Sequence, residues 1–473
     1  MSDLAGLGIL VLGAGVSGCA AARLAHSRGA EVTVVDSAPR ERLSADALRL
    51  ESEGIALRCG ELPAAWDGPE VSQVVVSPGV RLDSPLHRLA ESTGAAIVGE
   101  LEFGASFLKC PCLAVTGTNG KTTTTELLAA CLEGAGCRAL ASGNIGLPVS
   151  QVALENRQLD CLVVEVSSFQ LEHAASFQPQ VAILLNVTPD HLDRHGTLER
   201  YRSLKARLLE QVAPGGTAIY HAAVEESLRL PETVRRSRIW LAGETPNIDG
   251  RPGGKDWRVG VDGLRTVAQG EEGLSEELLM PRSMLALQGN HNLANALAVV
   301  AAMDALGFPF EKYRMQLSNF QSGPHRIQFV AARNGVKFFD DSKATDADAL
   351  VQALRTLGPS VGKTVHLIAG GLDKGCSLAE AKPEIRMYVK GAYLIGDCRL
   401  RLAQEWKDET ECRIFDSLED AVASAAQDAL DGEVVLLSPG CASMDMFKSY
   451  EERGRRFAAA VSALPPVDRL SCT

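Results

Sequence analysis

Short apolar runs that end in glycine- or serine-rich turns recur along the 473-residue chain. A strand that is apolar at almost every position is buried on both faces, as strands of parallel sheets are. We expect such strands at residues 8–12, 31–35, 71–76, 113–115, 160–166, 181–187, 366–369, 392–395 and 433–437. Several of these runs are separated by stretches with helical periodicity, so the pattern predicts an α/β fold built from parallel sheets.

The chain is long enough for two or three domains, and its motifs divide it into three. The β–α rhythm of the first part closes near Gly99, and the second part begins with the turn at Gly117. A predicted hairpin with Asn334 and Gly335 at its turn opens the third part. We therefore expect domains at residues 1–99, 100–321 and 322–473. The first and third would be Rossmann-like, and the central one would resemble P-loop ATPases.

Two stretches of the central part differ from this β–α pattern. Residues 221–285 are rich in Gly, Pro and Glu and show little buried pattern, so we predict a variable excursion with minor strands and no chemistry. Residues 289–307 predict an amphipathic helix with Asn292 and Asn295 three positions apart on one face. Asparagine at a helix start is commonly a cap, but two amides could equally contact an adenine edge.

Composition narrows the class of protein. Hydrophobic residues make up 46% of the chain and charged residues 22%, which is typical of a soluble α/β protein. No apolar run reaches the roughly 18 residues of a membrane span, and no basic segment of a signal peptide opens the chain. A net charge of -12 argues against a nucleic-acid groove. The twelve cysteines are scattered, and the pair Cys110 and Cys112 has no second pair nearby, so we expect free thiols in a cytoplasmic protein rather than zinc.

The sequence LAVTGTNGKTTTTE at residues 113–126 predicts a phosphate site. Gly117 and Gly120 allow a tight turn between a buried strand and a helix, so that backbone N–H groups and the positive end of the helix meet one anion. Lys121 would add a cation for the outer phosphates, and the Thr122 hydroxyl would ligate Mg²⁺. Val115 stands where the standard spacing requires a glycine, so the loop is a shortened variant of the P-loop.

Two further residues follow neighbouring strands of the central part. Glu165 lies inside the buried run at 160–166, and an isolated buried carboxylate must be paired or bound to a metal. Its place near the end of a strand that follows the phosphate loop favours a Mg²⁺ ligand over a structural hydrogen bond. His191 lies just past the run at 181–187, at the edge where open α/β sheets bind ligands, although a lone histidine there is more often an ordinary loop residue.

The first part carries a dinucleotide fingerprint. Gly13, Gly15 and Gly18 have the G-x-G-x-x-G spacing between a strand and a helix, and Asp36 ends the next strand, about twenty residues further on. The pattern alone indicates NAD(H). A glycine turn needed only for close helix–strand packing is the alternative.

Gly- and Ser-rich turns follow the strands of the third part at β–α spacing, which predicts a second open parallel sheet. Arg326, Lys343 and Lys374 lie at these edges. They would make an anion-facing rim, unless they form a solvated basic edge.

Several motifs, in this order, resemble those of the Mur ligase family: GTNGKTTT, Glu165 in EVSSFQLE, DHLDRH, Lys205, the G-x-HN-x-x-N helix and DSKAT. The resemblance covers nearly the whole chain. It implies a cytoplasmic, ATP-driven amide ligase of peptidoglycan precursor synthesis, and hence of cell-wall growth and division. DSKAT and the LSPGCAS ending favour addition of D-glutamate to UDP-N-acetylmuramoyl-L-alanine. The alternatives are a family ligase for another amino acid, an NAD-dependent oxidoreductase fused to an ATPase-like module, and a non-catalytic nucleotide switch.

The implied reaction has two steps. The substrate carboxylate attacks the γ-phosphorus of ATP to give an acyl phosphate, which the amine of D-glutamate opens through a tetrahedral intermediate. Catalysis is mostly charge neutralisation and alignment. The resemblance implies that Lys121, with Mg²⁺ on Thr122 and Glu165, neutralises the γ-phosphoryl oxygens, and that a second Mg²⁺ near His191 draws in the carboxylate. Lys205 matches the family's carbamylated lysine, whose carbamate would support the metal.

The resemblance also implies the ligand contacts. For the UDP-sugar it implies Val16, Ser17, Asp36, Ser37, Ser77 and Gly79 in the first domain, with Asn144, Gln170 and His191 at the reaction centre. For ATP it implies Gly117, Thr118, Asn119, Gly120, Lys121, Thr122 and Thr123, with Asn292 and Asn295 at the adenine and His325, Arg326 and Asp341 over the ribose and phosphates. For D-glutamate it implies Lys343, Thr345, Lys374, Ser443 and Tyr450. Asp346 and Tyr450 depart from the common Asn and Phe of the family pattern without removing a catalytic charge.

Because these ligands come from different domains, the third domain is expected to swing closed over the site. The chain is expected to act as a monomer, without nucleic acid and without membrane insertion.

Overall fold

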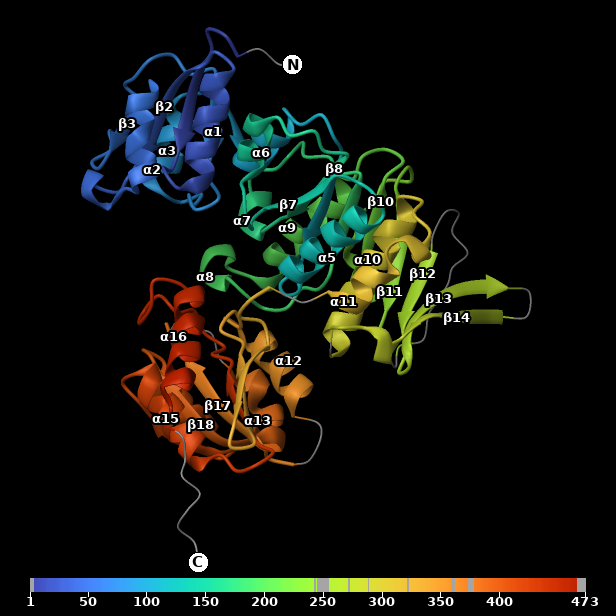
Figure 1. Cartoon of the computed structure of the whole chain (residues 1–473). Coiled ribbons are helices and arrows are strands. Elements are labelled where there is room, and N and C mark those ends of the chain that lie inside the picture. The colour runs from blue at the N-terminus through green and yellow to red at the C-terminus, as the bar shows by residue number, and fades with distance from the viewer. Residues whose placement is uncertain are drawn as a thin grey trace, which may run out of the picture. The chain divides into compact units, whose positions relative to one another are not determined.

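The computed structural model describes residues 4–241, 244, 255–270, 273–287, 289–320, 323–358, 362–372 and 378–465. The chain divides into two compact units, Met1–Ala286 with Asn292–Phe320 and Leu287–His291 with Gln321–Thr473. Figure 1 shows strands and helices alternating along the chain, and the strands form three sheets. The prediction of an α/β fold with mostly parallel sheets is therefore confirmed.

The first sheet has five parallel strands in the order β3-β2-β1-β4-β5. Its strands are β1 Gly8–Leu12, β2 Glu31–Asp36, β3 Ala56–Cys59, β4 Gln73–Val76 and β5 Ala96–Gly99. The helices of this part are α1 Val16–Ser27, η1 Arg40–Arg42, α2 Ala45–Arg49, η2 Leu50–Glu53, α3 Pro85–Ser92 and α4 Glu100–Ala105. The strand order reverses beside β1, which is the place where doubly wound sheets bind ligands.

The second sheet has nine strands in the order β14-β13-β12-β11-β10-β9-β6-β8-β7. Its strands are β6 Cys112–Thr116, β7 Ala139–Gly143, β8 Cys161–Glu165, β9 Val181–Leu184, β10 Thr217–His221, β11 Arg235–Trp240, β12 Lys255–Val259, β13 Gly263–Gly270 and β14 Gly273–Pro281. Only the pairings of β13 with its two neighbours are antiparallel. The helices of this part are α5 Lys121–Gly134, α6 Val149–Glu155, α7 Ser168–Leu171, α8 Leu192–His195, α9 Leu198–Glu210, η3 Ala222–Ser227, η4 Arg282–Met284, α10 Asn290–Ala305, η5 Phe310–Lys312 and α11 Arg314–Asn319.

The prediction of minor strands in residues 221–285 was wrong, because β11 to β14 are full members of this sheet. Charged residues inside the strands hid the buried pattern. Arg238 and Asp256 are both buried and lie 2.9 Å apart, Nε to Oδ1, on the adjacent strands β11 and β12. A paired charge can be buried where a lone one cannot.

Helix α10 also differs from its prediction. We expected an amphipathic helix, but every residue from Asn295 to Met303 is buried. The stretch after Asn295 is apolar at each position, which is typical of a helix buried on all sides. The helix begins at Asn290, so Asn292 and Asn295 lie within its first two turns and neither is its cap.

The third sheet has six strands in the order β15-β16-β20-β17-β18-β19, and only the edge strand β15 is antiparallel. Its strands are β15 Gln328–Arg333, β16 Val336–Asp340, β17 Val365–Gly370, β18 Val389–Ile395, β19 Glu411–Ile414 and β20 Val434–Leu437. Its helices are α12 Ala347–Leu357, η6 Ala379–Ala381, α13 Lys382–Tyr388, α14 Arg399–Trp406, α15 Leu418–Asp428 and α16 Tyr450–Ala463. The predicted hairpin is confirmed, and Asn334 and Gly335 both have positive φ angles, 52° and 77°, as its tight turn requires.

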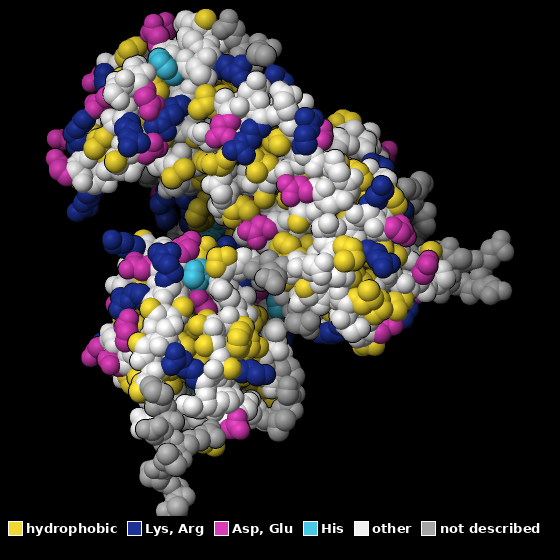
Figure 2. All heavy atoms as spheres, viewed as in Figure 1, with side chains coloured by type: hydrophobic (Ala, Val, Ile, Leu, Met, Phe, Trp, Pro, Cys, Tyr) yellow, Lys and Arg dark blue, Asp and Glu magenta, His cyan; other side chains and the backbone are white. Residues whose placement is uncertain are grey.

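Acidic and basic side chains of the described residues are interspersed on the face of the molecule shown in Figure 2. The described cysteines are all free thiols. Among the described residues, no helix combines the length and the apolar character needed to cross a bilayer.

Candidate functional site

The predicted phosphate loop lies between β6, whose five residues are all buried, and the start of α5 at Lys121. Gly120 has a φ angle of 84°, and a Cβ atom there would lie 2.5 Å from the Asn295 side-chain oxygen, so only glycine fits. The Lys121 side chain folds back over the loop, where Nζ donates to the carbonyl oxygens of Gly117 (3.0 Å) and Thr118 (2.7 Å). The strand, turn, helix and cation are therefore arranged as an anion site requires.

Glu165 ends β8 beside this loop and is 2% exposed. Its Oε2 accepts a hydrogen bond of 2.6 Å from the Thr122 hydroxyl, and its Oε1 accepts one of 2.8 Å from the Asn144 amide. Sequence reasoning placed all three residues in the site, and the structure brings them together. A hydroxyl and a carboxylate are hard oxygen donors of the kind that Mg²⁺ prefers.

The described residues contain no group of three or more His, Cys, Asp or Glu side chains that could hold a metal ion. A site of one carboxylate and one hydroxyl still fits Mg²⁺, because this ion keeps several waters and shares substrate phosphates.

Lys205 lies on α9 and is 1% exposed. Its Nζ donates to the Gly117 carbonyl oxygen at 2.7 Å and lies 4.6 Å from the centre of the Tyr201 ring. Burial, and after it the charge of Lys121, lowers the pKa of the Lys205 ammonium well below its usual value of 10.5. A buried amine of this kind is more easily neutral than an ordinary lysine.

His191 is the residue before α8 and has a positive φ angle of 52°. Its Nε2 lies 3.3 Å from the Asp190 carboxylate, and its ring packs edge-on against Phe169 at 4.8 Å between centroids. The imidazole remains about one-third exposed, 34%. It is therefore ordered by its neighbours and still accessible.

Gln170 and Asn295 use their amides locally. Gln170 completes a capping box at the start of α7, where its Oε1 accepts from the Ser167 backbone N–H at 2.9 Å. Asn295 donates to the Asn292 side-chain oxygen at 3.4 Å and packs against Gly120. Both asparagines belong to the surroundings of the phosphate loop.

Asn186 is a residue of this site that sequence reasoning missed. Its side-chain oxygen accepts the backbone N–H groups of Thr118 (3.0 Å) and Asn119 (2.9 Å), and its amide donates to the Asn119 carbonyl oxygen at 3.0 Å. The predicted strand ran through position 187, whereas β9 ends at Leu184. A polar residue so close to the end of an apolar run was the signal that could have found it.

The glycine turn of the first sheet has the geometry of its motif. Gly13 has a φ angle of 88°, a Cβ on Gly18 would lie 1.8 Å from the Gly13 carbonyl oxygen, and a Cβ on Gly15 would meet no atom within 4 Å. The open position at Gly15 allows a ligand to approach the backbone. The Asp36 carboxylate accepts the backbone N–H groups of Ala14 (2.7 Å) and Ala38 (2.8 Å), so it also holds the turn itself.

The other residues expected at this turn follow the same strand ends. Ser77 is buried and donates to the Gly13 carbonyl oxygen at 3.2 Å, whereas Val16, Ser37 and Gly79 are exposed.

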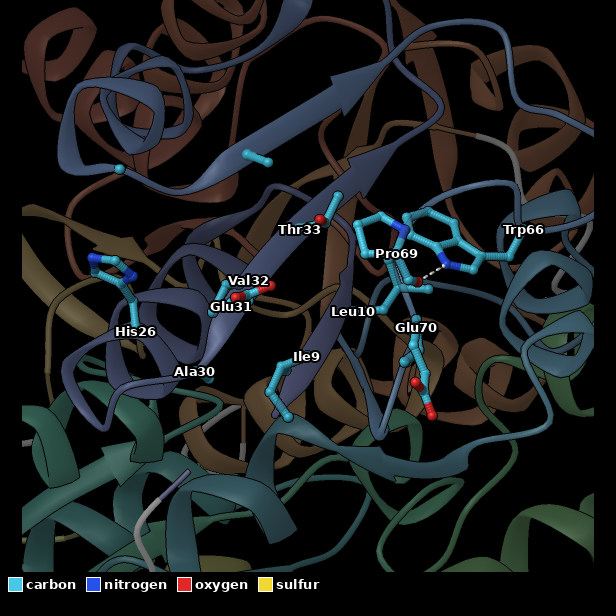
Figure 3. A pocket seen from close by; sticks show the side chains of 14 residues that line it. Ile9, Leu10, His26, Ala30, Glu31, Val32, Thr33, Trp66, Pro69 and Glu70 are labelled. Carbon is cyan, nitrogen blue, oxygen red and sulfur yellow. Dashed lines mark hydrogen bonds between the residues drawn. The ribbon is translucent and has the colours of Figure 1, made fainter. Parts of the chain in front are cut away.

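A cavity of about 290 Å³ lies at the opposite edge of the first sheet (Figure 3). Its lining includes Gly8 and Glu31, which begin β1 and β2, and Trp66, whose indole N–H donates to the Pro69 carbonyl oxygen at 2.7 Å. Ligands of open α/β sheets bind at the carboxyl ends of the strands, so this cavity is separate from the expected site.

In the second unit, His325 and Asp341 are buried beside the end of β16. His325 Nδ1 lies 2.6 Å from Asp340 Oδ2. Asp341 accepts hydrogen bonds from the Ser438 hydroxyl (2.8 Å) and the Ile327 backbone N–H (3.2 Å). Burial raises the pKa of the Asp341 carboxyl from 3.8 to about 7, despite these donors.

Of the residues expected at D-glutamate, Lys343, Thr345 and Ser443 lie on loops of this unit, and Tyr450 begins α16. Lys343 Nζ lies 5.2 Å from the centre of the Tyr450 ring, Ser443 is buried and Thr345 is exposed. Lys374 falls outside the described residues.

Arg453 was also missed by sequence reasoning. It is fully buried on α16 and donates from Nε to the Ser342 hydroxyl (2.9 Å), from Nη2 to the Ser342 carbonyl (2.8 Å) and from Nη1 to the Cys441 carbonyl (3.0 Å). One guanidinium therefore joins the loops that carry Lys343 and Ser443.

Comparison with known proteins decides the family. The model of the Mur ligase middle domain matches residues 115–303, that of the Mur ligase MurD-like N-terminal domain matches residues 8–99, and that of the Mur ligase glutamate ligase domain matches residues 325–441. The chain belongs to the Mur ligase family. The NAD(H) interpretation of the first part is therefore not retained.

Relatives cover the chain almost completely. It is 38% identical over 459 residues to the UDP-N-acetylmuramoylalanine–D-glutamate ligase of Pelotomaculum thermopropionicum, which covers 96% of this chain and 97% of the relative. The ligase of the same name from Koribacter versatilis is 36% identical over 459 residues, which is 97% of this chain and 98% of the relative. Among solved structures, the MurF ligase of Thermotoga maritima in complex with ADP has the same fold, with a TM-score of 0.57, 16% identity, and coverage of 91% of this chain and 95% of that one.

Proposed function

We propose that the chain joins D-glutamate to UDP-N-acetylmuramoyl-L-alanine, with ATP as the energy source and ADP and phosphate as products. The observation that carries this proposal is the contact between Thr122 and Glu165 beside a glycine loop whose carbonyl oxygens bind both Lys121 and Lys205. The names of the near-full-length relatives support the choice of substrates. The reaction would take place in the cytoplasm, and the enzyme would act as a monomer.

An amine does not displace oxide from a carboxylate at neutral pH, so the acceptor carboxylate must first be phosphorylated. Two anions then approach each other, and the site must neutralise their charge. Lys121 supplies a cation at the loop, where its side chain donates to the Gly117 and Thr118 carbonyl oxygens. If the side chain turned from these carbonyls to the γ-phosphoryl group, it would neutralise the charge of that group. His191, ordered by Asp190 and Phe169, would orient the acceptor carboxylate.

Thr122 and Glu165 would hold Mg²⁺, which neutralises phosphoryl oxygens when bound. The Asn144 amide keeps the Glu165 carboxylate in place for this role. A second ion would lie near His191 and Lys205.

Lys205 would act as a carbamate. Carbamylation joins CO₂ to a neutral amine and releases one proton, and the lowered pKa of Lys205 favours that neutral amine. The resulting anion would suit a metal ion better than an ammonium would, because like charges repel.

The proposal divides the chain at residues 99 and 321. Residues 1–99 would bind the UDP part through the open face of Gly15 and the exposed Val16, Ser37 and Gly79. Residues 100–321 would bind ATP, and residues 322–473 would contribute His325, Arg326 and Asp341 to ATP and Lys343, Thr345, Lys374, Ser443 and Tyr450 to D-glutamate. The reaction would then need groups from both units, so the third domain would close on the central one during catalysis.

A phosphate-release assay tests the proposal. The full chain is incubated with ATP, Mg²⁺ and a matrix of UDP-muramoyl acceptors and amino acids. Phosphate should appear only when UDP-N-acetylmuramoyl-L-alanine and D-glutamate are both present. Release with a different amino acid, or with ATP alone, would reject the proposed substrates, and a fluorescence titration with NADH should show no binding.

A further inference from the structure

We propose that Asn186 is a positioning residue that holds the phosphate loop in its binding shape and connects it to the turn that carries His191. The inference rests on the proposed function, because it assigns Asn186 a role in nucleotide binding and not in the chemical step.

The Asn186 side chain binds the loop through both ends of its amide. Its oxygen accepts two neighbouring backbone N–H groups, those of Thr118 and Asn119, at 3.0 and 2.9 Å, and its nitrogen donates to the Asn119 carbonyl at 3.0 Å. No other residue type of this size offers an acceptor and a donor on one planar group. Three contacts on three successive peptide groups fix the loop more closely than a single hydrogen bond does.

These contacts determine which N–H groups of the loop can bind an anion. Glycine loops that bind phosphate point several N–H groups at one centre. The N–H groups of Thr118 and Asn119 point instead at Asn186, so the structure assigns phosphate binding to Lys121 and to the first turn of α5. In this arrangement Thr118 and Asn119 support the shape of the loop, and Lys121 and the first turn of α5 bind the phosphate.

A second set of contacts extends from the loop toward His191. The Thr118 hydroxyl donates to the Thr188 carbonyl at 3.1 Å, accepts the Thr188 backbone N–H at 3.0 Å and lies 3.2 Å from the Tyr201 hydroxyl. Thr188 is three positions before His191 in the sequence. A shift of the phosphate loop is therefore transmitted to the turn that carries the imidazole.

Two variants of the full chain test the inference. Asn186→Ala removes the side-chain acceptor of the Asn119 N–H and one of two acceptors of the Thr118 N–H, whose other partner is the Asn186 backbone carbonyl at 3.0 Å. Affinity for ADP with Mg²⁺, measured by calorimetry, should therefore fall about 10-fold or more. Asn186→Asp keeps an acceptor but loses the donor and adds a negative charge near the bound phosphates, so it should also lower the affinity for ADP. Hydrogen exchange of the peptide that contains Thr118 and Asn119 should be faster in Asn186→Ala and stay slow in Asn186→Asp.

The matched control is Asn156→Ala. Asn156 is the C-cap that follows α6, with a φ angle of 49°, and its side-chain oxygen accepts from the exposed Lys109 amine at 3.1 Å. Its loss should therefore lower stability without touching the phosphate loop. Its ADP affinity should stay within about twofold of the wild type. A purely structural role for Asn186 would reproduce this behaviour, with a lower melting temperature and unchanged ADP affinity in the folded protein, and would overturn the inference.

The proposed function and the role of Asn186 can fail separately. A wild-type chain that does not bind ADP would contradict the proposed function. A wild type that binds ADP no better than either Asn186 variant would contradict only the role of Asn186. If Asn186→Ala does not fold, the affinity of Asn186→Asp alone decides, and wild-type affinity in that variant rejects the inference.

Discussion

The Thr122 hydroxyl and the Glu165 carboxylate are joined by a hydrogen bond of 2.6 Å, although 43 positions separate them in the sequence. Sheet topology explains the contact. β6 and β8 are parallel neighbours in register, with Val115 opposite Glu165, so the helix that follows β6 begins beside the carboxylate that ends β8. β7 lies on the other side of β8 and delivers Asn144 to the second carboxylate oxygen.

Glu165→Gln should abolish most turnover without unfolding the protein. The amide has nearly the same shape, but it removes the negative charge from the contact with Thr122 and Asn144, and with it the proposed Mg²⁺ site. We expect kcat to fall on the order of 100-fold or more, which corresponds to a few kcal/mol of transition-state stabilisation. Phosphate release at saturating substrates measures it.

Asp160→Asn is the control for this variant. Asp160 directly precedes the same strand and pairs with Arg138 at the surface, 2.7 Å from Nη2 to Oδ1. Its loss should leave kcat unchanged within about twofold, because exposed ion pairs contribute little. Equal kcat losses in both variants would show that Glu165 acts only through the stability of β8.

Lys121→Ala should abolish turnover while binding of UDP-N-acetylmuramoyl-L-alanine survives. The lysine contacts only the phosphate loop among its described hydrogen bonds, and the turn at Gly13 is built by other strands. Calorimetry with the UDP-sugar and a phosphate-release assay measure the two properties separately. Parallel loss of both would contradict the assignment of UDP and ATP to different domains.

The sequence predicted the central features of this site because they follow local rules. An apolar run, two glycines and a lysine define the phosphate loop by themselves, and parallel strands place Glu165 near it without further information. The hairpin at Asn334 and Gly335 was predictable for the same reason, since its turn chemistry is local.

Asn186 and Arg453 were not predictable from local patterns. Each acts through backbone groups that are distant in sequence, Thr118 and Asn119 for the first and Ser342 and Cys441 for the second. Any residue offers such groups, so no pattern of side chains announces them. The strands β11 and β12 escaped prediction because Arg238 and Asp256 satisfy each other inside the sheet.

Lys205→Ala should be inactive, and a short carboxylic acid should restore part of the activity. The added carboxylate would replace the proposed carbamate in the cavity left by the side chain, and added bicarbonate should increase wild-type activity in CO₂-depleted buffer. Phosphate release with and without the additive measures the rescue. Full activity of Lys205→Ala without any additive would reject this role.

Asp341→Asn should change how stability depends on pH. The folded-state pKa of Asp341, about 7, lies above its unfolded value of 3.8, so the folded state binds more protons between these limits. The contribution of Asp341 to the free energy of unfolding is therefore fully present below about pH 4 and is lost as the pH rises to 7. The variant should gain stability relative to the wild type at pH 8 and lose that advantage near pH 4, as urea unfolding followed by tryptophan fluorescence would measure. An advantage of the same size at both pH values would show that the pKa of Asp341 is not raised in the folded state.

Arg453→Lys should weaken the binding of D-glutamate more than the binding of the UDP-sugar. A lysine can replace one of the three hydrogen bonds that Arg453 makes to Ser342 and Cys441, so the loops of Lys343 and Ser443 lose their common anchor. We expect the KM for D-glutamate to rise about 10-fold, in line with the loss of one to two buried hydrogen bonds. The KM for UDP-N-acetylmuramoyl-L-alanine should stay within about twofold, because its proposed contacts lie in the other unit.

Arg333→Lys separates this effect from lost stability. Arg333 ends β15 in the same unit and also donates to two backbone carbonyls, those of Leu464 at 2.7 Å and Ser462 at 2.8 Å. It touches neither the loop of Lys343 nor that of Ser443 in its described hydrogen bonds, so its replacement should lower the melting temperature and leave the KM for D-glutamate unchanged. If both variants raise that KM equally, the anchor acts through general loosening of the third sheet. If only Arg453→Lys does, the three hydrogen bonds of the buried guanidinium to Ser342 and Cys441 are what hold the loops of Lys343 and Ser443 in register.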